Sequence, residues 1–228
     1  MPDYCVHPCP SFSGACKAIP AVAIEGPRLL LTPFDESITE EESRTLYQYS
    51  CVDQDLYRWM RFDPRSGYDV YRNQHLIGRW TRSADRLPFI ARDKHTNEIV
   101  GINSFMSING NDKTIEIGHI WTAGPFQGQK VALESTQLLM RYAMDLGFVR
   151  IEWRTHHKNV PSQRTAAAAG FTFEGILRKQ RFLKGETQNT FSYSVIDDEF
   201  DAVRKTIDAV FVTLRPIERR PVPGLTGE

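Results

Sequence analysis

The chain has 228 residues, of which 41% are hydrophobic and 25% charged, as is typical of a soluble globular domain with extensions. Its 28 basic and 28 acidic residues cancel, so no overall field favours nucleic acid or an acidic membrane surface. No apolar run is long enough to cross a bilayer and no signal peptide opens the chain, so we expect a cytoplasmic protein without nucleic acid or membrane as partner.

Residues 1–26 are predicted to form a flexible leader. Three of the four cysteines (Cys5, Cys9 and Cys16) lie there, together with His7. The spacing Cys-x-His-x-Cys is tighter than the usual zinc-ligand pairs, which are separated by two to four residues. We therefore expect no metal site.

The first part of the domain is predicted to alternate between strand and helix. The apolar run from Arg28 to Phe34 predicts a strand, and Thr39 with Glu42 gives the capping signal of one or two helices that reach Met60. Residues 61–86 contain prolines and glycines, which indicate a loop with one more helical piece around residues 68–76.

Strands follow from Leu87 onward. Residues 88–91 and 98–105 read as a hairpin joined by the turn residues 93–97. Residues 114–121 alternate at Ile115, Ile117 and His119, which predicts a third strand.

The segment GPFQGQKVALEST, residues 124–136, leads into a helix. Val131, Leu138, Tyr142 and Leu146 fall on one stripe of that helix, and Gly147 is placed to end it. Residues 149–154 read as the next strand, so the order predicts a right-handed parallel crossover.

The last part repeats this alternation. Residues 162–169 form a short helix between Pro161 and Gly170, and residues 171–173 and 175–183 pair with residues 190–196. A final helix begins at residue 197 and runs to about Leu214, before a tail rich in proline and glycine.

The loop at residues 124–132 offers a place for an anion, because N–H groups at a helix N-terminus lack partners and the helix dipole attracts negative charge. Neither G-x-x-x-x-G-K-[ST] nor G-x-G-x-x-G occurs in the sequence. With Gly128 alone, local spacing favours an ordinary helix start over a phosphate cradle.

The order of elements and several motifs change that balance. Together they resemble the GNAT superfamily of acyl-CoA N-acyltransferases, in its RimJ/RimL-like branch, over residues 27–198. The resemblance implies an α/β fold with a mixed central sheet of six or seven strands flanked by helices, followed by a C-terminal helix and tail over residues 199–228. It rests on Arg28-Leu-Leu-Leu-Thr-Pro33, Ile117-Gly-His-Ile-Trp121, Lys158-Asn-Val-Pro-Ser-Gln-Arg164, Gly170-Phe-Thr-Phe-Glu-Gly-Ile-Leu-Arg178 and Tyr193-Ser-Val-Ile196.

The resemblance implies that the loop binds the pyrophosphate of coenzyme A through backbone amides. Gln127 and Ala132 match the ends of the family motif, but Lys130 stands where the family usually has glycine. The lysine either crowds the phosphate or adds a compensating charge, and Gly128 could relieve the close approach. The implied coenzyme-binding residues are Ile120, Trp121, Thr122, Gln127, Gly128, Gln129, Lys130, Val131, Ala132, Asn159 and Ser162.

Three side chains are candidates for proton transfer. The resemblance places Ser162 near the sulfur as proton donor, although a serine there is also a common helix cap. Glu116 could remove the amine's proton through water, or it could be a solvent-facing or salt-bridged strand carboxylate. His119 is a second candidate base, with packing as its alternative. His156 and His157 are adjacent and so predicted to point in opposite directions, which excludes a metal pair.

The implied function is acetyl-CoA-dependent N-acetylation of a primary amine by a monomer or homodimer without metal. We expect the acceptor between the first helices (about residues 36–78) and the late hairpin (about residues 180–192), where acids could attract a cationic amine. The alternative is a catalytically weak acyl-CoA-binding or interaction module on the same fold. The acids are Asp53, Asp55, Asp63, Asp69 and Glu186.

Overall fold

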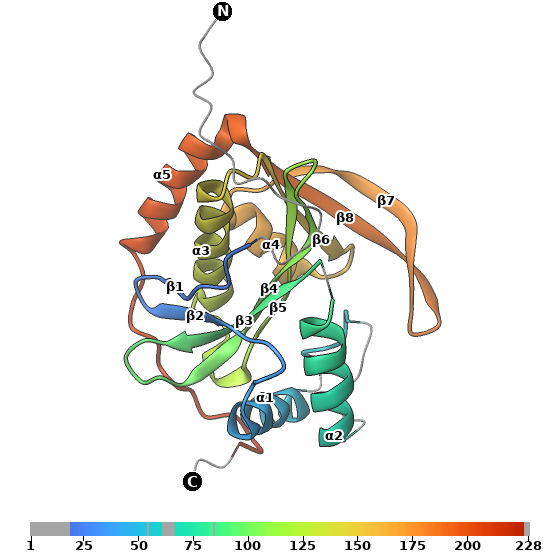
Figure 1. The fold of residues 1–228 in the computed structure, drawn as a ribbon, viewed down its shortest axis with the longest axis vertical. Coiled ribbons are helices and arrows are strands. Elements are labelled where there is room, and N and C mark those ends of the chain that lie inside the picture. The colour runs from blue at the N-terminus through green and yellow to red at the C-terminus, as the bar shows by residue number, and fades with distance from the viewer. Residues whose placement is uncertain (1–18, 54, 61–66, 84, 226–228) are drawn as a thin grey trace, which may run out of the picture.

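A computed structural model describes residues 19–53, 55–60, 67–83 and 85–225, which fold around one mixed sheet (Figure 1). In the described part the sheet has eight strands in the order β1-β2-β3-β4-β5-β6-β8-β7. All neighbours are antiparallel except β5 and β6, which are parallel. The strands are β1 (Ile24–Glu25), β2 (Leu29–Pro33), β3 (Leu87–Asp93), β4 (Ile99–Asn109), β5 (Thr114–Thr122), β6 (Arg150–His156), β7 (Thr172–Leu183) and β8 (Glu186–Ile196).

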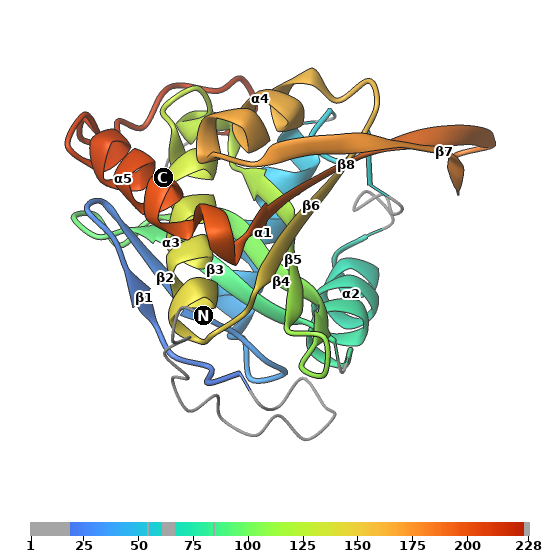
Figure 2. The same cartoon turned by 90° about the horizontal axis from the view of Figure 1, so that it is seen from above.

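Helices cover both faces of this sheet. Figure 2 shows α1 and α2 on the opposite side of the central strands from α3, with α4 and α5 beside α3. The sheet and its two helical layers are the expected α/β GNAT fold, with the two-residue strand β1 as an unexpected addition. The helical elements are α1 (Glu40–Val52), α2 (Tyr68–Val70), η3 (Tyr71–Thr81), η4 (Gly124–Phe126), α3 (Val131–Asp145), α4 (Val160–Ala169), η5 (Asp197–Glu199) and α5 (Phe200–Phe211).

The N-terminal helix begins where its capping signal predicts. Thr39 is its N-cap, and Thr39 and Glu42 exchange the two hydrogen bonds of a capping box. The helix ends at Val52, and turns lead on to Met60. The helical piece expected around residues 68–76 is longer and runs through α2 and η3 to Thr81, whose hydroxyl bonds the Ile77 carbonyl.

The predicted parallel crossover is confirmed. β5 leads through η4 and α3 to β6, and Gly147, at φ 84°, follows the end of α3. The stripe residues Val131 and Leu138 are buried in the core beneath the sheet. α4 likewise ends at Gly170, which adopts the left-handed conformation at φ 103°.

The C-terminal part adds two features. β7 is one strand through Gly175 rather than the two expected pieces, because an irregularity between Phe173 and Gly175 keeps it paired with β8. This hairpin extends away from the body in both views (Figures 1 and 2). After α5 the chain runs back past the N-terminus of α3 toward α1 (Figure 1). None of the described helices is long and apolar enough to span a membrane.

Candidate active site

The two central parallel strands separate after a short paired region. β5 and β6 pair only from Thr114 to Glu116 and from Arg150 to Glu152. Beyond this point β5 continues along β4 and β6 continues along β8, which pairs His156 with Thr190. The facing edges of residues 117–122 and 153–156 are therefore not bonded to each other, which leaves backbone groups of both strands available to a ligand.

We call the space between residues 117–122 of β5 and residues 153–156 of β6 the wedge, and a bulge reshapes β5 along it. Between Ile102 and Ser104 of β4, the opposing stretch of β5 runs from Trp121 to Gly118 and contains one extra residue. His119 lies in this stretch with φ 49°, a left-handed conformation. The bulge breaks the strict alternation predicted from the sequence, although Ile115 and Ile117 are buried as expected.

The loop after β5 presents its N–H groups to an anion. Gly128 has φ 74°, and Lys130, the N-cap of α3, has φ 60° and ψ 19°. Among the described residues, none accepts a hydrogen bond from the backbone N–H groups of residues 128–133. Six consecutive donors at the N-terminus of a 15-residue helix fit a pyrophosphate group.

The side chain of Gln127 shapes this loop. Its amide donates to the carboxylate of Asp53 at 2.8 Å and to the carbonyl of Thr122 at 3.1 Å. It thereby ties the loop to the end of α1 and to the end of β5. Asp53, which we expected near a cationic acceptor, is thus engaged with the loop of residues 124–132.

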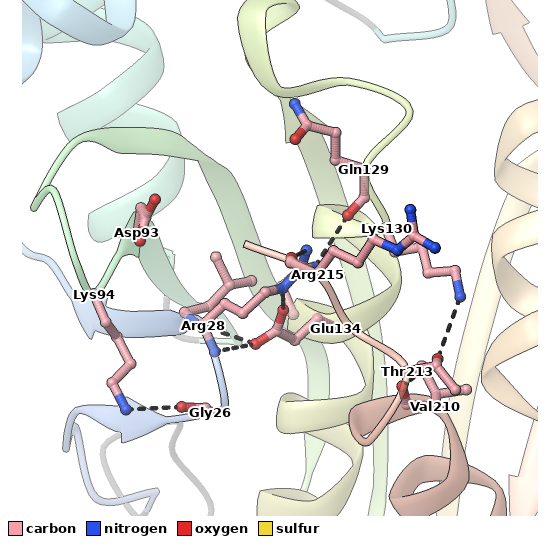
Figure 3. A network of polar contacts seen from close by, with 12 residues as sticks. Gly26, Arg28, Asp93, Lys94, Gln129, Lys130, Glu134, Val210, Thr213 and Arg215 are labelled. Atoms are coloured by element: carbon pink, nitrogen blue, oxygen red, sulfur yellow. Dashed lines mark hydrogen bonds and ion pairs between the residues drawn. The ribbon is translucent and has the colours of Figure 1, made fainter. Parts of the chain in front are cut away.

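An ion pair that the sequence did not reveal lies beneath the loop (Figure 3). Arg28 Nε donates to Glu134 Oε2 at 2.7 Å, and both side chains are buried. The other Glu134 oxygen accepts the backbone N–H groups of Arg28 and Leu29, at 2.9 and 3.1 Å. Arg28 Nη2 donates to the carbonyl of Gln129 at 3.0 Å. The start of β2 therefore fixes both the loop and the first turn of α3.

A signal for this pair does exist in the sequence. Glu134 falls three residues after Val131 and four before Leu138, on the stripe that faces the sheet. An acid at such a position is buried, and a buried carboxylate requires a cation or several donors. Arg28 directly precedes the apolar run of β2 and supplies Glu134 with a cation, its guanidinium, and with a donor, its backbone N–H.

The side chain of Lys130 turns away from the loop. Its ammonium lies 3.5 Å from the hydroxyl of Thr213, in the segment after α5 (Figure 3). The side chain thus extends toward the C-terminal segment. The left-handed backbone explains why glycine is the easier residue at this position, since a Cβ there costs about 1–2 kcal/mol.

At the start of α4, Asn159 and Ser162 have different tasks. The N-cap is Asn159, whose Oδ1 accepts from the Ser162 N–H at 3.3 Å. The capping alternative for the Ser162 hydroxyl therefore does not hold. This hydroxyl instead accepts from the indole N–H of Trp153 at 3.2 Å, which leaves its own proton available for donation.

Glu116 lies at the vertex of the wedge, in the last pair that joins β5 to β6. Its side chain is only 4% exposed, so it does not face solvent. The hydroxyl of Ser107 donates to it at 3.2 Å, and Arg154 Nη1 lies at 3.6 Å. Burial raises the pKa of Glu116, and the positive charges of Arg154 and Arg181 partly oppose that shift.

His119 is held neutral. Burial, with the charges of Arg86 and Arg79, lowers its pKa to about 3. Its ring stacks on Trp80 with centroids 5.0 Å apart, and its Nδ1 is buried without a hydrogen-bond partner in the described part of the chain. An imidazole in this state is a weak proton acceptor at neutral pH.

His156 and His157 do not point apart as predicted. Their rings lie 4.4 Å from each other, because β6 ends at His156 and the chain then turns. His156 also stacks on Trp59 at 4.4 Å.

Among the described residues no cluster of three or more His, Cys, Asp or Glu side chains could hold a metal ion. Residues 1–18 of the leader, which hold its three cysteines, and Asp63 lie outside the described residues. The rest of the predicted leader is not a loose tail, because Ile19 is buried in the core and Ile24–Glu25 form β1.

Several predicted coenzyme contacts are restricted to the backbone. Trp121 is buried, with its ring tilted against Tyr57 at 6.2 Å, and Val131 is buried as well. Ile120, Thr122 and Ala132 are half-buried. A ligand in the wedge would therefore meet the main chain of residues 120–122 rather than the Trp121 ring.

The opposite side of the wedge is bounded by the segment after α1 and by the late hairpin. Lys184, at the hairpin tip, donates to the carbonyls of Tyr57 and Arg58 at 3.1 and 3.3 Å. Together with the stacking of Trp59 on His156, this contact brings the segment after α1 to β6 and β7. These elements are the ones between which the acceptor was expected.

The comparison with protein families assigns residues 28–172 to the acetyltransferase (GNAT) domain. The ribosomal-protein-serine acetyltransferase of Escherichia coli K12 is 27% identical over 168 residues, which cover 71% of this chain and 91% of that protein.

Solved structures agree with the fold. A GCN5-related N-acetyltransferase from Brucella melitensis superposes with a TM-score of 0.76 at 28% identity, covering 87% of this chain and 89% of that one. A ribosomal L7/L12 alpha-N-protein acetyltransferase, RimL, determined in complex with coenzyme A, superposes with a TM-score of 0.62. At 23% identity, over 79% of this chain and 98% of RimL, that likeness shows the fold.

Proposed function

Because the chain belongs to the acetyltransferase (GNAT) domain family, we propose that it transfers an acetyl group from acetyl-CoA to a primary amine, either of a small molecule or of a protein N-terminus. The observation that carries this proposal is the row of N–H groups at residues 128–133, which have no acceptor in the described structure and lie beside the wedge between β5 and β6. A pyrophosphate binds at such a row without side-chain charges.

The coenzyme would supply the acetyl thioester and would be held by the backbone of residues 127–132 and of residues 120–122. N–H groups at the unpaired edge of β5 would polarise the thioester carbonyl as its oxygen gains charge. Asn159 would contact the coenzyme arm through the part of its amide that does not cap α4. Arg28 and Glu134 support this arrangement from below by fixing the loop to β2.

Two residues would transfer protons during the reaction, one from the amine and one to the sulfur. The amine nitrogen forms the new bond to the acetyl carbon and loses one proton, while the carbon–sulfur bond breaks and the sulfur gains one. We assign proton removal to Glu116, acting through water, because its raised pKa makes it a better acceptor than an ordinary carboxylate. Ser162 gives its proton to the sulfur and regains one from solvent, with the Trp153 N–H stabilising its oxygen meanwhile.

The acceptor would enter between the segment after α1 and the β7–β8 hairpin, on the other side of the sheet from α3. His119 would line this site and would not act as its base, since burial lowers the pKa of the imidazole and makes it a weak proton acceptor. The relatives include an acetyltransferase named for ribosomal-protein serine, and a protein N-terminus is one acceptor of the proposed class.

Release of free thiol from acetyl-CoA across a panel of amines and N-terminal peptides tests this proposal. We expect amine-dependent thiol release, with kcat reduced about 100-fold in Ser162→Ala and little change in the KM for acetyl-CoA. Binding of acetyl-CoA without thiol release for any acceptor would instead indicate an acyl-CoA-binding module. If acetyl-CoA does not bind at all, the proposed function fails.

A further inference from the structure

The segment that follows α5 lies against the outer side of the coenzyme loop. The side-chain amide of Gln129 donates to the Glu218 carbonyl at 2.7 Å and accepts from the Glu218 N–H at 2.9 Å. The Arg220 N–H donates to the Pro125 carbonyl at 3.0 Å. We call residues 213–225 the C-terminal segment; it lies outside the matched family region, which ends at residue 172.

Other contacts anchor the C-terminal segment at both ends. Arg28 Nη1 donates to the Arg215 carbonyl at 2.7 Å, so a single guanidinium bonds Glu134, the loop and this segment (Figure 3). Farther along, Arg219 pairs with Glu98. Leu225 packs against the hydrophobic core. The segment is therefore built into the fold next to the loop.

These contacts use the carbonyl side of the loop. The loop carbonyls of Pro125 and Gln129 accept from Arg220 and Arg28, whereas the N–H groups of residues 128–133 keep no partner in the described chain. The C-terminal segment thus fixes the loop backbone without occupying the donors that an anion requires. A fixed row of donors binds an anion more tightly, because ordering it costs nothing at the moment of binding.

The side chain of Arg220 adds a positive charge to the same place. Its Nη1 lies 3.5 Å from the position that a Cβ on Gly128 would occupy. No described residue forms a hydrogen bond or an ion pair with this guanidinium. Its neighbour Arg219, in contrast, is already paired with Glu98. The planar fork of a guanidinium beside free N–H groups can bond two oxygens of one phosphate.

We propose that the C-terminal segment completes the coenzyme site. Arg220 binds the pyrophosphate of acetyl-CoA from outside the loop, and the Gln129–Glu218 contact positions both the loop and the arginine. This inference rests on the proposed function and extends it to residues beyond the family domain. It also explains how a loop that carries Lys130 in place of glycine keeps its binding conformation, since the segment bonds Gln129, directly before the lysine, and the lysine side chain itself.

Calorimetric titration of the full-length protein with coenzyme A tests the inference. We expect Arg220→Ala to weaken binding about tenfold and Arg220→Lys to restore part of the loss, because lysine keeps the charge but not the fork. Arg204→Ala is the matched control: this arginine of α5 pairs with Asp145 at the end of α3, and its loss should leave affinity within twofold. Gln129→Ala should also weaken binding, with no change in the KM for the amine.

Titration with dephospho-coenzyme A, which lacks the 3′-phosphate, shows whether Arg220 contacts the pyrophosphate or the 3′-phosphate. The Arg220→Ala loss should be the same with this ligand if the pyrophosphate is the partner. Unchanged affinity in Arg220→Ala, an equal loss in Arg204→Ala, or a loss confined to intact coenzyme A would overturn the assignment of Arg220. Unchanged affinity in Gln129→Ala would overturn the positioning role. If the wild-type protein does not bind coenzyme A, the proposed function fails and this inference with it.

Discussion

The guanidinium of Arg28 and the carboxylate of Glu134 meet at 2.7 Å beneath the coenzyme loop, in a fully enclosed position. Each group also bonds the backbone: Glu134 accepts the N–H groups of Arg28 and Leu29 at the start of β2, and Arg28 donates to the carbonyls of Gln129 and Arg215. One buried pair therefore joins β2, α3, the loop and the C-terminal segment. Its geometry supports the proposed coenzyme site as well as the core.

Replacing Glu134 with glutamine should destabilise the fold strongly. The amide keeps an acceptor for the β2 backbone but leaves the Arg28 charge buried without a counter-charge, and breaking such a pair typically costs about 3–5 kcal/mol. Urea unfolding measures the loss. Asp208→Asn, which breaks the exposed pair with Arg141, is the control and should cost less than about 1 kcal/mol. Equal, small losses in both variants would contradict a structural role for the buried pair.

Two substitutions at Lys130 separate backbone strain from charge. Lys130→Gly removes the Cβ from a left-handed residue and should stabilise the fold by about 1 kcal/mol relative to Lys130→Ala. Both should bind acetyl-CoA as well as the wild type, since the ammonium extends toward Thr213. Thermal unfolding and titration provide the two readouts. A comparable drop in affinity for both variants would show that the lysine charge contributes to binding.

The proton acceptor should be visible in the pH dependence of the rate. Burial raises the pKa of Glu116, and its charged form takes the proton, so kcat should rise with pH through a value above the ordinary 4.5. Glu116→Gln should lower kcat about 100-fold and abolish this rise. A pH–rate profile of both proteins is the measurement. The same profile in the variant would exclude Glu116 as the base.

His119 should make the fold sensitive to acid. Its folded-state pKa of about 3 lies below the ordinary 6.5, so the unfolded chain binds a proton that the native protein refuses. Its contribution to stability is present above pH 6.5 and declines as the pH falls toward 3. His119→Phe, which keeps a ring to stack on Trp80, should lose less stability between pH 7 and pH 5 than the wild type. Urea midpoints at the two pH values measure it; equal losses would contradict the burial of a neutral imidazole.

Hydrophobic periodicity and turn residues predict most of the helices and strands of this fold. The capping box at Thr39 and Glu42, the stripe through Val131 and Leu138, and the stop at Gly147 are local signals, and the structure follows each of them. The bulge at His119 was not predictable, because it depends on the register with β4 and not on the residues of β5 themselves.

The sequence predicts less of the site than of the fold, because the residues that hold the loop in place come from segments far apart in the chain. Arg28 and Glu134 are 106 positions apart, and Gln129 and Glu218 are 89 apart. No spacing rule connects such pairs. The sequence leaves Ser162 open between helix cap and proton donor; the structure assigns the cap to Asn159, and proton donation by Ser162 stays a proposal.

The loop of residues 127–132 is proposed to bind acetyl-CoA, and a melting curve with and without this ligand is the decisive test. At 100 times its dissociation constant, acetyl-CoA should add about 2.7 kcal/mol to the free energy of unfolding and raise the Tm accordingly. An unchanged Tm at millimolar acetyl-CoA would show that this loop does not bind acetyl-CoA.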